Sequence, residues 1–149
     1  ALGVDSWYNQ SEGTVFAEAT CNVVKSSPYM YGYEFSDGTS SACGPTLAPT
    51  HNGTYTGLFS PVNGSYANAV LLFTPANLNK TAFAFNSSLI AGSANGSAVI
   101  TDTSGLDPDV EKLYIGSGRN PGVQLNGHIT RLAYFPTRKT DQELIDLTT

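Results

Sequence analysis

The sequence predicts an all-β fold, an antiparallel sandwich with one short C-terminal helix. Short apolar segments recur along the 149 residues, and turn-forming residues, among them 15 glycines and 8 prolines, lie between them. Only 13% of the residues are charged and 40% are hydrophobic, which is enough to build one packed domain over residues 1–149. The chain starts abruptly at Ala1, which fits a domain excised from a longer protein, although a natural start is the open alternative.

Four strands are predicted in the first half of the chain. They are residues 14–19, 29–35, 54–59 and 69–74. The second of them alternates strictly, as a strand with one buried face does, and the fourth is apolar on both faces, as a covered central strand is. The pairs Asn52-Gly53 and Asn63-Gly64 supply turns before the third and fourth strands.

The second half contains five further predicted strands, about nine in all. They are residues 81–85, 88–92, 97–101, 112–116 and 128–135. Asn95-Gly96 predicts a type I′ hairpin turn between the second and third of these strands. Gly116 ends a strand where the chain must bend, and Asn126-Gly127 is expected to give a tight turn with positive φ.

The last strand and the helix can be described residue by residue. Strict alternation over 128–135 predicts two faces: Ile129, Arg131, Ala133 and Phe135 on one, and His128, Thr130, Leu132 and Tyr134 on the other. Thr140 and Glu143 fit a capping box at a helix start. The helix then has an apolar face for docking on the sandwich, made of Leu144, Ile145 and Leu147.

Composition excludes several kinds of protein. The net charge is −5 and the seven Lys and Arg residues are scattered, so no basic stripe exists for nucleic acid. No apolar run approaches the roughly 20 residues of a membrane-spanning helix, so membrane insertion is not expected. Cys21 and Cys43 could form a disulfide if their strands lay side by side, but two buried thiols are the favoured alternative.

Several segments resemble a known family. They are Tyr114-Ile-Gly, Leu125-Asn-Gly-His-Ile, Arg131-Leu-Ala-Tyr-Phe-Pro and Thr140-Asp-Gln-Glu-Leu, with Ser6-Trp-Tyr-Asn-Gln-Ser-Glu-Gly near the start. Together they are similar to concanavalin A-like (laminin G-like) jelly-roll domains, in the version found in bacteriophage structural and tail proteins. The resemblance is less specific over residues 36–75.

The resemblance implies a jelly roll of two antiparallel sheets and a place on a virion, at the tail or capsid surface. It implies a non-enzymatic module that binds a glycan or host surface. The alternative is a structural or decoration domain that binds other virion proteins and no glycan. Phage appendages are often trimers, so the resemblance also suggests a homotrimer. Function does not follow from fold alone, so each of these is an expectation by analogy.

Catalysis is not expected, and no cofactor is required. Glucanases of the resembled fold need closely spaced carboxylates on one strand, and this chain has no such pattern. The two histidines, His51 and His128, lie in no nucleophile motif. Laminin G-like domains often bind calcium, which makes the acidic loop a candidate metal site; its carboxylates are Asp102, Asp107 and Asp109. A solvated turn is the favoured interpretation of that loop.

Aromatic residues are the candidates for ligand binding. Tyr29, Tyr31, Tyr33 and Phe35 are spaced to share one face of a strand and could stack on sugar rings. The favoured alternative is that this face packs into the core or against a neighbouring subunit. Trp7 has the same two alternatives. The predicted ligand-binding residues are therefore Tyr29, Tyr31, Tyr33 and Trp7.

Overall fold

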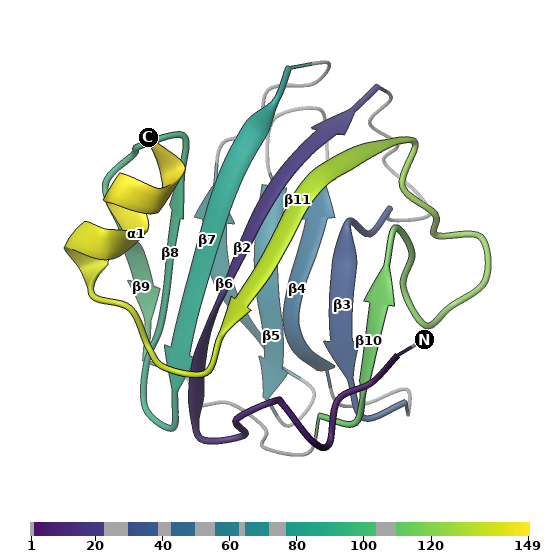
Figure 1. Cartoon of the computed structure of the whole chain (residues 1–149), viewed down its shortest axis with the longest axis horizontal. Coiled ribbons are helices and arrows are strands. Elements are labelled where there is room, and N and C mark those ends of the chain that lie inside the picture. The colour runs from purple at the N-terminus through teal and green to yellow at the C-terminus, as the bar shows by residue number, and fades with distance from the viewer. Residues whose placement is uncertain are drawn as a thin grey trace.

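The computed structural model confirms the sandwich of two antiparallel sheets with one C-terminal helix (Figure 1). It describes residues 2–22, 30–38, 43–49, 56–62, 65–71, 77–103 and 110–149. For residues 43–44, 48–49, 56–62 and 65–71 the description is limited to the backbone. Eleven strands and one helix lie within these residues.

The six-stranded sheet has the order β1-β10-β3-β4-β5-β6. Its strands are β1 (Leu2–Gly3), β3 (Tyr33–Ser36), β4 (Cys43–Pro49), β5 (Thr56–Val62), β6 (Ser65–Leu71) and β10 (Lys112–Ile115). The antiparallel pair β5 and β6 places Val62 opposite Ser65, on either side of the predicted Asn63-Gly64 turn in the sequence. The turn itself and Asn52-Gly53 lie outside the described residues.

The five-stranded sheet has the order β11-β2-β7-β8-β9. Its strands are β2 (Glu12–Cys21), β7 (Asn79–Asn86), β8 (Ile90–Ala94), β9 (Ile100–Asp102) and β11 (Gly127–Phe135). After β8, Asn95 and Gly96 have φ of 50° and 71°, and the amide of Ser97 donates to the carbonyl of Ala94 at 2.9 Å. The predicted turn with positive φ at both central residues is confirmed.

The core lies between the two sheets. Strand β3 contributes Tyr33 and Phe35, and β7 contributes Phe83 and Phe85. The ring of Tyr8 stacks on Phe85 at 5.8 Å between centroids and ties the first loop to this core. Large aromatic groups in offset contact bury much apolar area, so this cluster supplies a major part of the stability of the sandwich.

Strand β4 was not predicted. It contains Cys43 and lies in a different sheet from Cys21. The segment Cys43-Gly-Pro-Thr-Leu-Ala-Pro contains glycine and proline, which are poor strand formers, yet it pairs with both β3 and β5. Cys21 lies on β2 in the other sheet, so the two cysteines are not on laterally adjacent strands. Cys21 is buried beside Met30.

A β-bulge corrects the predicted faces of β11. The pairing of β11 with β2 shifts register between Ile129 and Arg131. Ile129 packs on the core between the sheets, as do Leu132 and Tyr134, while Ala133 and Phe135 pack on the other face. Alternation therefore holds from Arg131 onward, but the extra residue at the bulge places Ile129 on the opposite face from the predicted one.

Helix α1 (Asp141–Thr148) covers the outer face of the five-stranded sheet over β7 and β8 (Figure 1). Leu144 is fully buried, and Leu147 packs beside it; the sheet residues beneath them include Phe16, Ala82, Ala84 and Ala91. Small alanines on the strands allow the helix to approach closely, so the predicted docking is confirmed for these two leucines. Within the described residues no helix is long and apolar enough to cross a membrane.

The predicted capping box is present and makes one component of the stability depend on pH. The Thr140 amide donates to Glu143 Oε2 at 2.8 Å, and the Thr140 hydroxyl accepts from the Glu143 amide. The backbone bond from Thr140, with further bonds from Lys139 and the Thr140 hydroxyl, lowers the pKa of Glu143 from 4.5 to about 2.

We expect this component of stability to be complete above pH 4.5 and to be lost as the pH falls toward 2. A carboxylate with a lowered folded-state pKa stabilises only while it is ionised. Unfolding measured between pH 2 and 6 tests this. Glu143→Gln should flatten that part of the profile, and an unchanged profile in Glu143→Gln would show that other carboxylates are responsible.

Candidate functional site

The most unusual side chain of the six-stranded sheet is Glu34. Its neighbours Tyr33 and Phe35 on β3 face the core, so alternation places Glu34 on the outer face of the sheet. An outer-face carboxylate would ordinarily be solvated, yet Glu34 is only 2% exposed. Such burial requires that the charge be paired and hydrogen-bonded.

Arg119 binds both oxygens of this carboxylate. Its backbone amide donates to Glu34 Oε2 at 2.7 Å, and its guanidinium Nη1 donates to Glu34 Oε1 in an ion pair. One residue thus contacts one carboxylate through both its main chain and its side chain. The Arg119 side chain retains 18% of its exposure, although its Nε is buried, so the side chain still reaches the surface.

The segment 116–125 carries Arg119 to this position. Gly116 has φ of 70°, which bends the chain directly after β10 as predicted. The amide of Gly116 donates to the carbonyl of Gly32 at 2.7 Å, and the amide of Leu125 donates back to the carbonyl of Gly116 at 2.9 Å. A further bond, from the amide of Tyr31 to the carbonyl of Val123 at 3.0 Å, holds the segment against the start of β3.

Two half-buried tyrosines border Glu34. Tyr114 on β10 is its cross-strand partner and therefore lies on the same face of the sheet. Tyr31 also lies close to Glu34, because a side chain at Gly118 would meet both the Tyr31 ring and Glu34 Oε2. Lys112, two residues before Tyr114, also lies on this face. We call Glu34, Arg119, Tyr31, Tyr114 and Lys112 the Glu34 site.

The Glu34 site combines aromatic rings with charged hydrogen-bonding groups. Tyrosine rings can stack on the apolar faces of sugars, while guanidinium and phenol groups bond to hydroxyls. Both oxygens of Glu34 are already bound to Arg119, which suits a structural carboxylate better than a proton donor. Among the described residues no group of three or more His, Cys, Asp or Glu could hold a metal ion.

The structure divides the predicted tyrosine stripe. Tyr33 is 1% exposed, and burial raises its pKa far above the usual range, so its ring cannot meet a surface ligand. This corrects the prediction for Tyr33 and shows the core alternative for it and for Phe35. Tyr31 precedes β3 and lies at the Glu34 site, and its ligand-binding role stays a prediction. Tyr29 lies outside the described residues.

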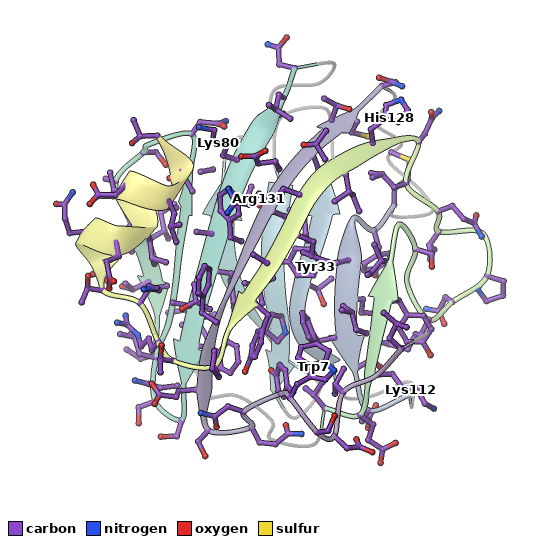
Figure 2. The ribbon with its side chains drawn as sticks, in the orientation of Figure 1. Trp7, Tyr33, Lys80, Lys112, His128 and Arg131 are labelled. Carbon is purple, nitrogen blue, oxygen red and sulfur yellow. The ribbon has the colours of Figure 1, made fainter. Side chains whose placement is uncertain are left out.

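Trp7 lies elsewhere, at one end of the sandwich (Figure 2). Its indole N–H donates to the carbonyl of Gly3 at 3.3 Å, and its ring meets Phe35 and Tyr134 edge-on. Because Phe35 faces the core, Trp7 is on the opposite side of β3 from Glu34. The indole is 39% exposed, so a binding role for Trp7 stays a prediction, separate from the Glu34 site.

The remaining predicted residues do not join the Glu34 site. Asp102 ends β9 at the edge of the other sheet, while Asp107 and Asp109 lie outside the described residues, so calcium binding by this loop stays a prediction. His128 is an exposed residue on the edge strand β11 (Figure 2), and His51 is outside the described residues.

Sequence reasoning missed Glu34 and Arg119, although a signal was present. Glu34 alternates with core aromatic residues, and a charge on the opposite face of such a strand marks the outer surface. The run Gly116-Ser117-Gly118-Arg119 follows a predicted strand and suggests a tight bend that carries a cation. Neither signal alone indicates that the two residues meet.

Comparison with solved structures shows that the fold is a jelly-roll sandwich. CBM40 of the Ruminococcus gnavus IT-sialidase, bound to α2,3 sialyllactose, is 16% identical, with a TM-score of 0.74 over 93% of this chain and 83% of that one. Domain 4 of the Geobacillus stearothermophilus arabinanase AbnA, in complex with arabinotriose, is 14% identical (TM-score 0.72; 97% and 69%). A SAP-like pentraxin from Limulus polyphemus is 12% identical (TM-score 0.65; 93% and 70%).

Sequence identities as low as these establish that the fold is shared and nothing further about this chain. No family model matches the chain, and no curated protein matches it by sequence.

Proposed function

We propose that this chain is a non-catalytic glycan-binding module and that the Glu34 site is its binding surface. The observation that carries the proposal is the pairing of buried Glu34 with Arg119 beside two half-buried tyrosines, Tyr31 and Tyr114. Two of the structural neighbours were solved with oligosaccharides, sialyllactose and arabinotriose, which supports a glycan as the class of ligand.

In this proposal each group has a distinct role. Glu34 fixes Arg119, so this partly exposed side chain is held ready to donate to sugar oxygens without losing further side-chain entropy. Tyr31 and Tyr114 supply ring surface for stacking and hydroxyls for hydrogen bonds. Lys112 adds a cation on the same face, which would favour a glycan that carries an acidic group.

We further propose that the module belongs to a bacteriophage virion, on a tail or capsid surface, where it attaches to the host. The sequence resemblance at both ends of the chain supports this setting. The alternative within the same setting is a decoration domain, homotrimeric by analogy with phage appendages, that binds other virion proteins and no glycan.

A glycan array run beside a mass measurement in solution tests the proposal. Sialylated and arabinose-containing oligosaccharides are the first probes, because the structural neighbours were solved with them. Specific binding that a free oligosaccharide competes away supports the module. Silence on the array, combined with tight binding to purified phage capsid or tail proteins, would replace the glycan module with the decoration domain.

Alanine substitutions of Tyr31 and Tyr33 should affect different properties, the first glycan binding and the second stability. Tyr31→Ala should abolish binding of the array-selected glycan and change the free energy of unfolding by no more than about 1 kcal/mol, because the ring is half-buried at the surface. Tyr33→Ala should lower that free energy by about 3–5 kcal/mol, because it empties a core position. Calorimetric titration and chemical denaturation measure both. Wild-type glycan affinity in Tyr31→Ala would remove Tyr31 from the site.

A further inference from the structure

The segment that carries Arg119 contains a glycine at its point of closest approach to Glu34. A Cβ atom at Gly118 would lie 2.6 Å from Glu34 Oε2 and 2.9 Å from Cδ2 of Tyr31. Both distances are shorter than any ordinary carbon contact, so the glycine backbone fills the space between the carboxylate and the ring. Gly118 is itself buried.

Backbone conformation does not explain this glycine. The positive-φ glycines of the described chain are Gly38, Gly96, Gly116 and Gly122, and Gly118 is not among them. An alanine could therefore adopt the Gly118 backbone angles without the strain of a left-handed conformation. The requirement at this position is space.

The absence of a side chain at Gly118 affects the position of the next residue, Arg119. The amide of Arg119 follows Gly118 and reaches Glu34 Oε2 at 2.7 Å, and the guanidinium of the same residue holds the other oxygen. A methyl group at position 118 would have to move either the carboxylate or the Tyr31 ring. Glu34 is held by two charge-assisted bonds, whereas Tyr31 is only half-buried, so we expect the Tyr31 ring to move first.

We infer that Gly118 is a positioning residue of the glycan site: it sets the distance between the Arg119–Glu34 pair and the stacking ring of Tyr31. The inference rests on the proposed function for its effect on affinity. Its effect on geometry is independent of any ligand. Gly118 touches no glycan in this scheme and acts only through its two neighbours.

Gly118→Ala tests the inference against Gly122→Ala. Gly122 lies in the same segment, has φ of 84° and has open space where its Cβ would be. Alanine there strains the segment but fills nothing. We expect Gly118→Ala to weaken glycan binding about tenfold or more, which corresponds to about 1.4 kcal/mol. Gly122→Ala should lower stability and leave affinity within about twofold.

A second readout needs no glycan. In a ¹H–¹⁵N spectrum, the Arg119 amide should be shifted downfield by its charge-assisted bond. In an aromatic ¹H–¹³C spectrum, the Tyr31 ring signals should move in Gly118→Ala but not in Gly122→Ala. If wild-type protein binds no glycan on any array, the proposed function fails, and the spectra still decide the geometric part. If wild-type protein binds and Gly118→Ala binds equally well, with unchanged Tyr31 signals, the inference is wrong and the proposed function stands.

If Gly118→Ala fails to fold, the double variant Gly118→Ala/Tyr31→Leu tests whether the new methyl group clashes with the Tyr31 ring. Leucine removes most of the ring that the new methyl group would meet, so the double variant should regain the folded state. A failure of the double variant to fold would show that the methyl group is excluded by Glu34 or the backbone, against the inference.

Discussion

Replacing Arg119 by alanine should remove glycan binding and lower the free energy of unfolding by about 3 kcal/mol. Glu34 is nearly inaccessible, and the variant would leave its carboxylate without the guanidinium that neutralises it. Removing one partner of a buried pair is costly because the remaining charge stays desolvated. Chemical denaturation gives the stability, and titration with the array-selected glycan gives the affinity.

Arg138→Ala is the matched control. Arg138 also forms an ion pair, with Asp141 at 3.2 Å, but that carboxylate is more than half exposed. Exposed pairs contribute about 0–1 kcal/mol, so this variant should lose little stability and no affinity. Arg119→Lys separates charge from geometry, since lysine keeps a cation for Glu34 Oε1 and the backbone amide for Oε2 but loses the planar guanidinium. Wild-type affinity in Arg119→Ala would mean that the glycan binds elsewhere.

Gly127→Ala should destabilise the sandwich by about 3 kcal/mol or more. The added Cβ would overlap the backbone carbonyl of Thr20, where β11 begins to pair with β2. A carbonyl in a strand cannot rotate aside as a side chain can, so the first residues of β11 would have to leave the sheet. Gly3→Ala, whose Cβ would meet nothing within 4 Å, should stay within about 0.5 kcal/mol of the wild type.

The Gly127 variant also shows how a motif can be recognised for the wrong reason. Asn126-Gly127 predicted a turn with positive φ, but the positive-φ residues of the described chain do not include Gly127. The glycine is required by the close approach of β2. Turn chemistry is local and readable from the sequence, whereas the approach of another strand is not. A melting temperature of Gly127→Ala equal to that of the wild type would contradict the close approach.

The parts of the fold that were predicted correctly depend on neighbouring residues. The Asn95-Gly96 turn and the Thr140–Glu143 capping box are each decided within four residues of chain. The face on which Ile129 lies was predicted wrongly because one extra residue in β11 shifts the alternation of side chains. The pattern of residue types does not indicate where a bulge occurs. Strand β4 was missed because pairing on both sides overrides its poor composition.

The candidate site was harder to predict than the fold. Glu34 and Arg119 are 85 residues apart in the sequence and meet only because β10 pairs with β3. Tyr31 was identified by its aromatic character, which is a property of the residue itself. Tyr33 has the same character but the opposite environment, because one face of β3 is core and the other is surface. Composition identifies candidate residues, and strand pairing decides which of them can meet a ligand.

The positions of helix α1 and the Glu34 site have a consequence for valency. The helix covers one outer face of the sandwich, and the Glu34 site lies on the outer face of the other sheet. Each chain therefore offers this site in a single direction. Under the proposed function one copy binds one glycan chain weakly, and strong attachment to a glycan-coated surface would come from several copies displayed side by side with their helices turned away from it.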